Sequence, residues 1–309
     1  MTSLIAIVLV LLEFSVGSAW AHVSTDTSFT DWHWRPDVII VVTFLSTAYV
    51  IGWRRLRRRK TRSTKKWQLL LYLTSMATIC LALLSPIDAL GSFLFIFHMT
   101  QHELLMILAA PLLLLANPLP VLLWGVPMRL RHRLGHLLTR DAPVRRALKA
   151  LTRMGFTLPI YMVNLWGWHY PRVFEAALRN GFIHDLQHLS FFIAGLLFWW
   201  PVIDPTPKVH GFIPYGFRIF YILAAALPTM VPLMALVITE RILYPYYETV
   251  PRLWGITVLQ DQSNGWSIMA ITEGTAYLIT ILLLLARMAE HEERLMRIEQ
   301  AASNLRSPL

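Results

Sequence analysis

Two segments of this chain share the pattern His-x-x-Gln-His, namely His98-Met99-Thr100-Gln101-His102 and His184-Asp185-Leu186-Gln187-His188. In a helix, residues four apart project from one face, one turn apart, so each segment presents two imidazoles on the same stripe. Paired imidazoles form a chelating arrangement, and polar groups in apolar segments are costly to insert unless they serve a site. The pattern therefore predicts a metal or cofactor site.

A fifth histidine, His169, ends another apolar segment in the motif Trp168-His169-Tyr170-Pro171. We expect His98, His102, His184 and His188 to be the primary ligands, and His169 an additional or alternating one. Neutral imidazole binds copper, zinc and iron alike, so these ligands do not select the ion by themselves. The alternative is that the five histidines only hydrogen-bond between helices.

Polar residues beside the histidines are candidates to support them. Gln101 and Gln187 are either amides that hold a histidine tautomer or plain helix–helix hydrogen bonds. Glu103 follows His102 and costs free energy in a membrane unless it is paired or protonated. Cys80 is the single cysteine, so one chain can form neither a disulfide nor a Cys-x-x-Cys site.

Composition predicts the elements that must position these residues. The hydrophobic fraction is 56% and the mean hydropathy +0.51, which is typical of a polytopic membrane protein of the all-α class. Seven transmembrane helices are expected within a domain of residues 37–287, followed by a cytoplasmic tail, 288–309. The expected spans are 37–53, 67–84, 92–115, 155–169, 184–203, 212–238 and 267–287.

The basic residues predict the orientation of these spans. Of 28 Lys and Arg residues, 23 fall on one side of the proposed membrane, concentrated in 54–66, 127–153 and 287–306, and five fall on the other. Cytoplasmic loops carry the excess of basic residues, so the N-terminus is expected outside and the C-terminus in the cytoplasm. The asymmetry accounts for the net charge of +10 without nucleic acid, and contact with anionic lipid is a secondary expectation. The histidine pairs then lie on two parallel helices near the outer face.

The N-terminus carries a signal-like segment, with the apolar run Leu4–Leu12 followed by Ala19-Trp20-Ala21. We expect a cleaved signal peptide, 1–21, before an external segment, 22–36; an uncleaved anchor is the alternative, because Glu13 interrupts the apolar run. Cleavage would expose His22, whose amine and imidazole could chelate copper. An ordinary flexible terminus is the alternative for His22.

Several ordered motifs resemble those of the CtaG-type cytochrome c oxidase assembly factors. The likeness runs from about Trp32 to Arg287. It is carried by the two histidine motifs, by Trp168-His169-Tyr170-Pro171, by Asp261-Gln262, and by the runs Ala109-Ala110-Pro111-Leu112-Leu113-Leu114 and Gly195-Leu196-Leu197-Phe198-Trp199-Trp200-Pro201. Asp261 is a further candidate for a residue that hydrogen-bonds to the ligands without binding the ion itself.

The resemblance implies a bacterial inner-membrane protein that matures a haem-copper oxidase by delivering or inserting copper. Expected partners are oxidase subunits and a periplasmic copper chaperone. The residues favour no enzyme, because the sequence contains no nucleophile–base constellation, phosphate-binding Gly loop or paired catalytic carboxylates. Two alternatives stay open: a membrane electron carrier with bis-His haem b, and a copper permease. The polar groups cluster in the outer half of the predicted spans, which argues against a permease.

Overall fold

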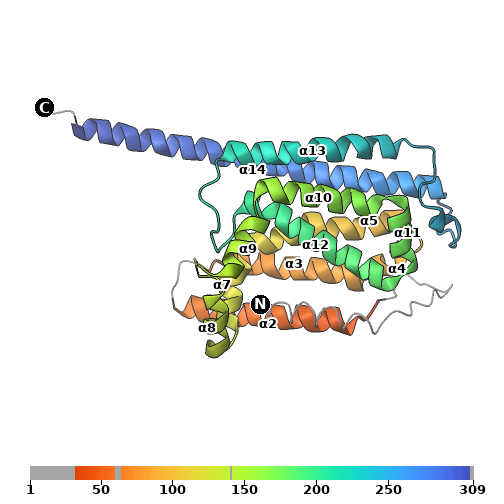
Figure 1. Ribbon diagram of the computed structural model, residues 1–309, viewed down its shortest axis with the longest axis horizontal. Helices are drawn as coiled ribbons and strands as arrows, with labels where there is room; N and C mark the ends of the chain where they lie inside the picture. Colours follow the sequence, from red (N-terminus) through yellow and green to blue (C-terminus); the bar gives the residue numbers. More distant parts are fainter. Residues whose placement is uncertain (1–31, 60–63, 140, 307–309) are drawn as a thin grey trace.

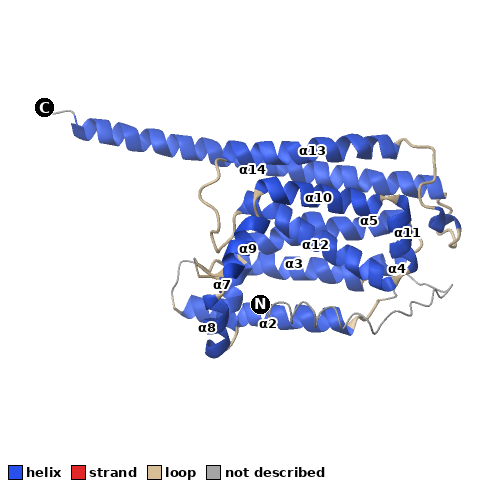
Figure 2. Cartoon of the chain, viewed as in Figure 1, coloured by secondary structure: helices blue, strands red, loops and turns tan. Residues whose placement is uncertain are grey.

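The computed structural model describes residues 32–59, 64–139 and 141–306. Every regular element in these ranges is a helix (Figure 2). The predicted signal peptide, 1–21, and His22 lie outside the described residues.

Among the described residues, six helices are long and apolar enough to cross a membrane, judged by length and composition. They are α2 (Pro36–Arg58), α3 (Lys66–Leu84), the composite helix α5–η2–α6 (Phe95–Leu115), α12 (Gly181–Ile203), α13 (Tyr215–Val237) and α14 (Val258–Arg306). The all-α membrane bundle predicted from composition is therefore confirmed.

The expected fourth span is a shorter helix, α10 (Met154–His169), with 16 residues and Pro159 inside it. At 1.5 Å per residue it is about 24 Å long, less than the roughly 30 Å of a bilayer's hydrocarbon core. It packs against α12 and α13 within the bundle. The ranges that the structure describes thus contain six helices of spanning length, where seven spans were expected.

Short helices lie at the two ends of the bundle (Figure 1). At one end, here called the α4 end, are α4 (Pro86–Gly91), α11 (Pro171–Arg179) and the 3-10 turn η3 (Pro245–Glu248). At the opposite end, the α8 end, are α7 (Pro118–Gly125), α8 (Met128–His136) and α9 (Pro143–Leu151). Helix α14 extends well past the bundle at the α8 end (Figure 1).

Two apolar clusters hold the helices together. The larger lies among α5, α10, α12, α13 and α14 and contains the fully buried rings of Phe95, Phe198 and Trp266. The smaller joins α2, α3 and α7 around Tyr49 and Tyr72, whose rings stack with centroids 3.7 Å apart. Helix α2 therefore belongs to a separate packing unit, beside the core that carries most of the histidines.

The third spanning helix changes its winding directly after the histidine pair. Residues Leu104–Ala109 form the π-helical turn η2 between α5 (Phe95–Glu103) and α6 (Ala110–Leu115). Pro111 has no N–H with which to continue the hydrogen-bond ladder. Neighbouring helices donate instead: Trp199 Nε1 to the Met106 carbonyl at 3.2 Å, and Ser75 Oγ to the Ala109 carbonyl at 2.8 Å. The wide turn is thus fixed by α12 and α3.

Candidate metal centre

His98 and His102 of α5 and His188 of α12 form a buried group, here called the His triad. Their exposed fractions are 1%, 0% and 3%. One ligand nitrogen from each lies within 4.8 Å of the others. Nitrogens around a tetrahedral ion with bonds of about 2.0–2.1 Å are about 3.3 Å apart, so small side-chain rotations would close the triad on an ion.

Five of the six ring nitrogens of the triad lack a partner within the described part of the chain. Both ring nitrogens of His102, both of His188 and Nδ1 of His98 have no hydrogen-bond partner among the residues that the structure describes. Buried polar atoms are nearly always satisfied, because an unpaired one is costly in an apolar interior. A metal ion that accepts one lone pair from each imidazole removes this cost for three of the five nitrogens. The donor set of the triad therefore fits a metal.

His98 is the oriented member of the triad. Its Nε2 donates to Gln187 Oε1 at 3.3 Å, which leaves the Nδ1 lone pair for an ion. Such a contact sets the tautomer and the ring orientation of a ligand. The same contact joins α5 to α12, so both roles considered for Gln187 are compatible with it.

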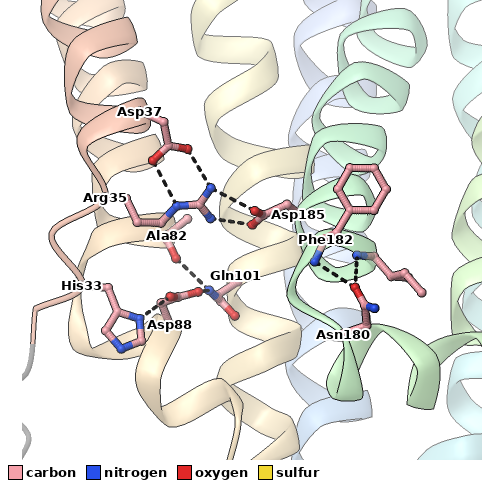
Figure 3. Close-up of polar contacts among 10 residues, drawn as sticks. His33, Arg35, Asp37, Ala82, Asp88, Gln101, Asn180, Phe182 and Asp185 are labelled. Atoms are coloured by element: carbon pink, nitrogen blue, oxygen red, sulfur yellow. Dashed lines mark hydrogen bonds and ion pairs between the residues drawn. The ribbon is translucent and has the colours of Figure 1, made fainter. Parts of the chain in front are cut away.

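A second group of potential ligands adjoins the triad at the α4 end. One ligand atom each from Asp88, His184 and His188 lies within 4.8 Å of the others, with Asp88 and His184 half-buried. Asp88 comes from α4 and had no place among the sequence candidates. Its Oδ2 accepts from His33 Nδ1 at 2.7 Å, and its Oδ1 accepts from Gln101 Nε2 at 2.7 Å (Figure 3).

Asp88 supplies negative charge to this end of the bundle. Burial by itself would raise the pKa of Asp88, but the hydrogen bond from His33, the neighbouring His184 and the hydrogen bond from Gln101 outweigh burial and lower the pKa below its ordinary value. Asp88 is therefore an anion at neutral pH.

His169 lies beside the triad but outside both ligand groups. Its ring centroid is 6.0 Å from that of His102. Its Nδ1 donates to the Leu165 carbonyl of its own helix at 2.7 Å, and its Nε2 lies 3.4 Å from Met99 Sδ. The bond to Leu165 places the ring proton on Nδ1 and leaves the Nε2 lone pair beside a thioether sulfur, which cannot donate to it. The role of His169 as an additional ligand stays a prediction.

Gln101 and Asp261 act on the site through the helices. Gln101 Nε2 donates to the Ala82 carbonyl at 2.8 Å as well as to Asp88, so it connects α5 to α3 and α4. The Asp261 carboxylate accepts from the backbone N–H groups of Phe95 at 2.8 Å and Ile96 at 3.0 Å. The first N–H groups of a helix have no intrahelical partner. Asp261 of α14 therefore caps α5 and sets its position.

Glu103 and Glu273 are buried carboxyl groups deeper in the same core, exposed by 3% and 0%. Glu273 Oε2 accepts from Tyr277 Oη at 3.1 Å, whereas neither oxygen of Glu103 has a hydrogen-bond partner within the described ranges. An uncompensated carboxylate is costly in such surroundings. Glu103 follows the triad residue His102, and its role as a supporting group stays a prediction.

A cavity of about 480 Å³ lies between α2, α3 and α12, and His188 lines it. Apolar side chains of the three helices form most of its wall. Ile40 and Leu189 line it and are themselves exposed, so the cavity reaches the lateral surface. At the α4 end it is bordered by Arg35, which pairs with Asp37 at 2.8 Å and Asp185 at 2.5 Å (Figure 3).

Comparison with known proteins shows which family the chain belongs to. Two mycobacterial proteins, the "Uncharacterized protein Mb0105" of Mycobacterium bovis and the "Uncharacterized protein MT0111" of Mycobacterium tuberculosis, are each 25% identical to this chain over 274 residues. The alignment covers 84% of this chain but 40% of each relative, so the chain spans less than half the length of these relatives. No solved structure matches the chain. Residues 47–291 match the model of the cytochrome c oxidase caa3 assembly factors (Caa3_CtaG), and the chain therefore belongs to this family.

Proposed function

We propose that this protein binds a copper ion at the His triad during assembly of a cytochrome c oxidase and passes it to an oxidase subunit. The observation that carries the proposal is the set of five buried imidazole nitrogens without protein partners in the described structure. Its role is binding and transfer, without a catalytic step. Family membership supports the assembly role, and the donor set supports the ion.

Copper is the ion that fits both the family membership and the nitrogen ligands of the triad. Nitrogen sites bind copper more tightly than the other divalent first-row metals, and imidazole also suits zinc and iron. A haem-copper oxidase needs copper in its core. The haem b alternative has weaker support, because the triad gathers three imidazoles, with ring centroids 4.5–5.8 Å apart, whereas a bis-His haem takes two axial imidazoles on opposite faces of the macrocycle.

The charge distribution supports an outward-facing site in the bacterial inner membrane. The basic segments of α8 and α9 lie at the α8 end, and the triad residues lie toward the α4 end of α5 and α12. The positive-inside rule then puts the α4 end on the periplasmic side. A periplasmic copper chaperone is the expected donor, and a membrane-embedded subunit the recipient.

The test uses histidine pairs, because ligands of one ion behave as a unit. After dialysis of purified protein against a chelator, His98→Ala/His102→Ala and His184→Ala/His188→Ala should each lose as much tightly held copper as the quadruple variant. Elemental analysis measures copper per protein, and thermal unfolding confirms the fold.

The matched control is His132→Ala/His136→Ala, an exposed pair with the same spacing on α8. It should keep the wild-type copper content. Full copper occupancy in a folded quadruple variant would reject the site.

A further inference from the structure

We infer that Asp88, His184 and His188 form a second, outer copper-binding group, from which the ion passes to the His triad. The inference rests on the proposed function and adds a ligand, Asp88, and an order of binding. One potential ligand atom from each of the three lies within 4.8 Å of the others.

Accessibility falls step by step from the α4 end inward. The side chain of His33, which is hydrogen-bonded to Asp88, is 45% exposed, and that of Asp88 is 12% exposed. His184 is half-buried, whereas His188 and His102 are buried. An ion that arrives from water therefore reaches Asp88 and His184 before it reaches the triad.

Asp88 keeps the capacity to bind a cation in addition to its hydrogen bonds. Each carboxylate oxygen has two lone pairs, and His33 and Gln101 each use one, on different oxygens. Gln101 lies on α5 between His98 and His102, so the carboxylate is held in register with the triad. The negative charge lowers the cost of bringing a cation into an apolar bundle.

His188 belongs to both groups, and both of its ring nitrogens lack a partner within the described ranges. The rings of His184 and His188 have centroids 4.2 Å apart, and His188 and His102 are 5.3 Å apart. A copper ion can therefore exchange Asp88 and His184 for His98 and His102 while it keeps its bond to His188. Stepwise exchange avoids releasing a bare cation into apolar surroundings.

The ligand types match this order. A carboxylate with two imidazoles is a mixed oxygen–nitrogen set, which receives a hydrated cation more readily than a set of imidazoles alone. The triad supplies nitrogen only and excludes water by burial. The outer group should therefore bind copper more weakly than the triad.

The experiment isolates the outer group by removing the triad. In detergent-purified His98→Ala/His102→Ala protein, titration with Cu(II) should show one ion, held at least tenfold more weakly than in wild-type protein. Its electron paramagnetic resonance spectrum should show coupling to two nitrogens. Adding Asp88→Asn should weaken this binding at least tenfold again, because the amide removes the charged ligand but still accepts a hydrogen bond from Gln101.

The matched control in the same background is Asp37→Asn, a half-buried carboxylate at the same end that pairs with Arg35 outside both groups. It should leave Cu(II) binding unchanged. His184→Ala provides a second loss variant, independent of any effect of Asp88 on the fold of α4, and thermal unfolding monitors all variants.

The outcomes separate the two proposals. Wild-type protein that binds no copper overturns the proposed function and this inference together. Two outcomes overturn the outer group alone, provided that wild-type protein binds copper. In the first, His98→Ala/His102→Ala protein binds no Cu(II). In the second, this protein binds Cu(II), but neither Asp88→Asn nor His184→Ala weakens the binding. Loss with both of these variants and retention with Asp37→Asn supports it.

Discussion

The histidines of the site differ in the contacts that their ring nitrogens make with other residues. His98 is held by Gln187, whereas His102 and His188 have no partner at either nitrogen within the described structure. His169 has neighbours at both, Leu165 and Met99. A ligand with free nitrogens can turn toward an ion at little cost, whereas the ring of His169 must first break its hydrogen bond to the Leu165 carbonyl.

This difference predicts unequal effects of single substitutions. His102→Ala should lose most of its tightly held copper, because it removes a ligand that has no other contact to satisfy. His169→Ala should keep most of the copper and mainly lower the unfolding temperature, since it removes buried contacts. Copper per protein and thermal unfolding measure the two effects. Equal copper loss in both variants would make His169 a primary ligand.

At the scale of elements, α5 is positioned from three sides. Asp261 of α14 caps its first turn, Gln101 ties it to α3 and α4, and the π turn that follows it is held by Trp199 and Ser75. Helix α12 approaches this turn closely at Gly195, where an added Cβ would lie 2.9 Å from the Met106 carbonyl oxygen. The spacing of α5 and α12, and so of the triad, depends on this contact.

Gly195→Ala should therefore push α12 away from the π turn. We expect a destabilisation of about 1–3 kcal/mol, as for other overpacked sites, together with weaker copper binding. The control is Gly167→Ala on α10, where an added Cβ meets nothing within 4 Å. Unfolding in detergent and copper titration test both variants. Wild-type stability and affinity in Gly195→Ala would show that the close approach does not set the triad spacing.

At the scale of the molecule, His188 lies between the α4 end of the bundle and a cavity that opens on its lateral surface. His188 belongs to both ligand groups at the α4 end and also lines the cavity between α2, α3 and α12. Because α2 packs mainly with α3 and α7, the cavity lies between two packing units. Under the proposed function, the ion arrives from the α4 end and leaves sideways, toward a subunit in the membrane.

A bulky side chain in the cavity should separate binding from transfer. Val41→Trp on α2 should leave copper binding to the purified protein unchanged and lower the copper content of the oxidase in membranes severalfold. Ile51→Trp is the control, because Ile51 is exposed on the same helix and does not line this cavity. Normal oxidase copper in Val41→Trp cells would argue against the lateral route.

Orientation in the membrane is the remaining prediction at this scale. Reporter fusions after Arg62 and after Arg140 should read cytoplasmic, as the distribution of basic residues predicts. Fusions near Asp88, Arg179 and Arg252 should read external. An external site is needed for copper supplied from the periplasm. A cytoplasmic result near Asp88 would put the ligand groups on the wrong face for that delivery.

The sequence by itself determined the features that depend on local periodicity. Apolar runs predicted the long helices, and the spacing of four residues predicted that His98 and His102 share one face of α5, as His184 and His188 share one face of α12. The ordered motifs also identified the family, which the match over residues 47–291 confirms. Helical periodicity and hydropathy act over a few residues, so a single sequence carries them.

Only the tertiary structure decided which distant groups meet. Asp88 joins the histidines because α4 folds back against α5, and Asp261 caps α5 across 166 residues of chain. The structure also shows that α10 is shorter than the other helices expected to span the membrane, and that His169 contacts residues outside the two ligand groups. Such contacts depend on how helices rotate and slide against one another, and that is set by side-chain packing across the whole core, which no local pattern in the sequence encodes.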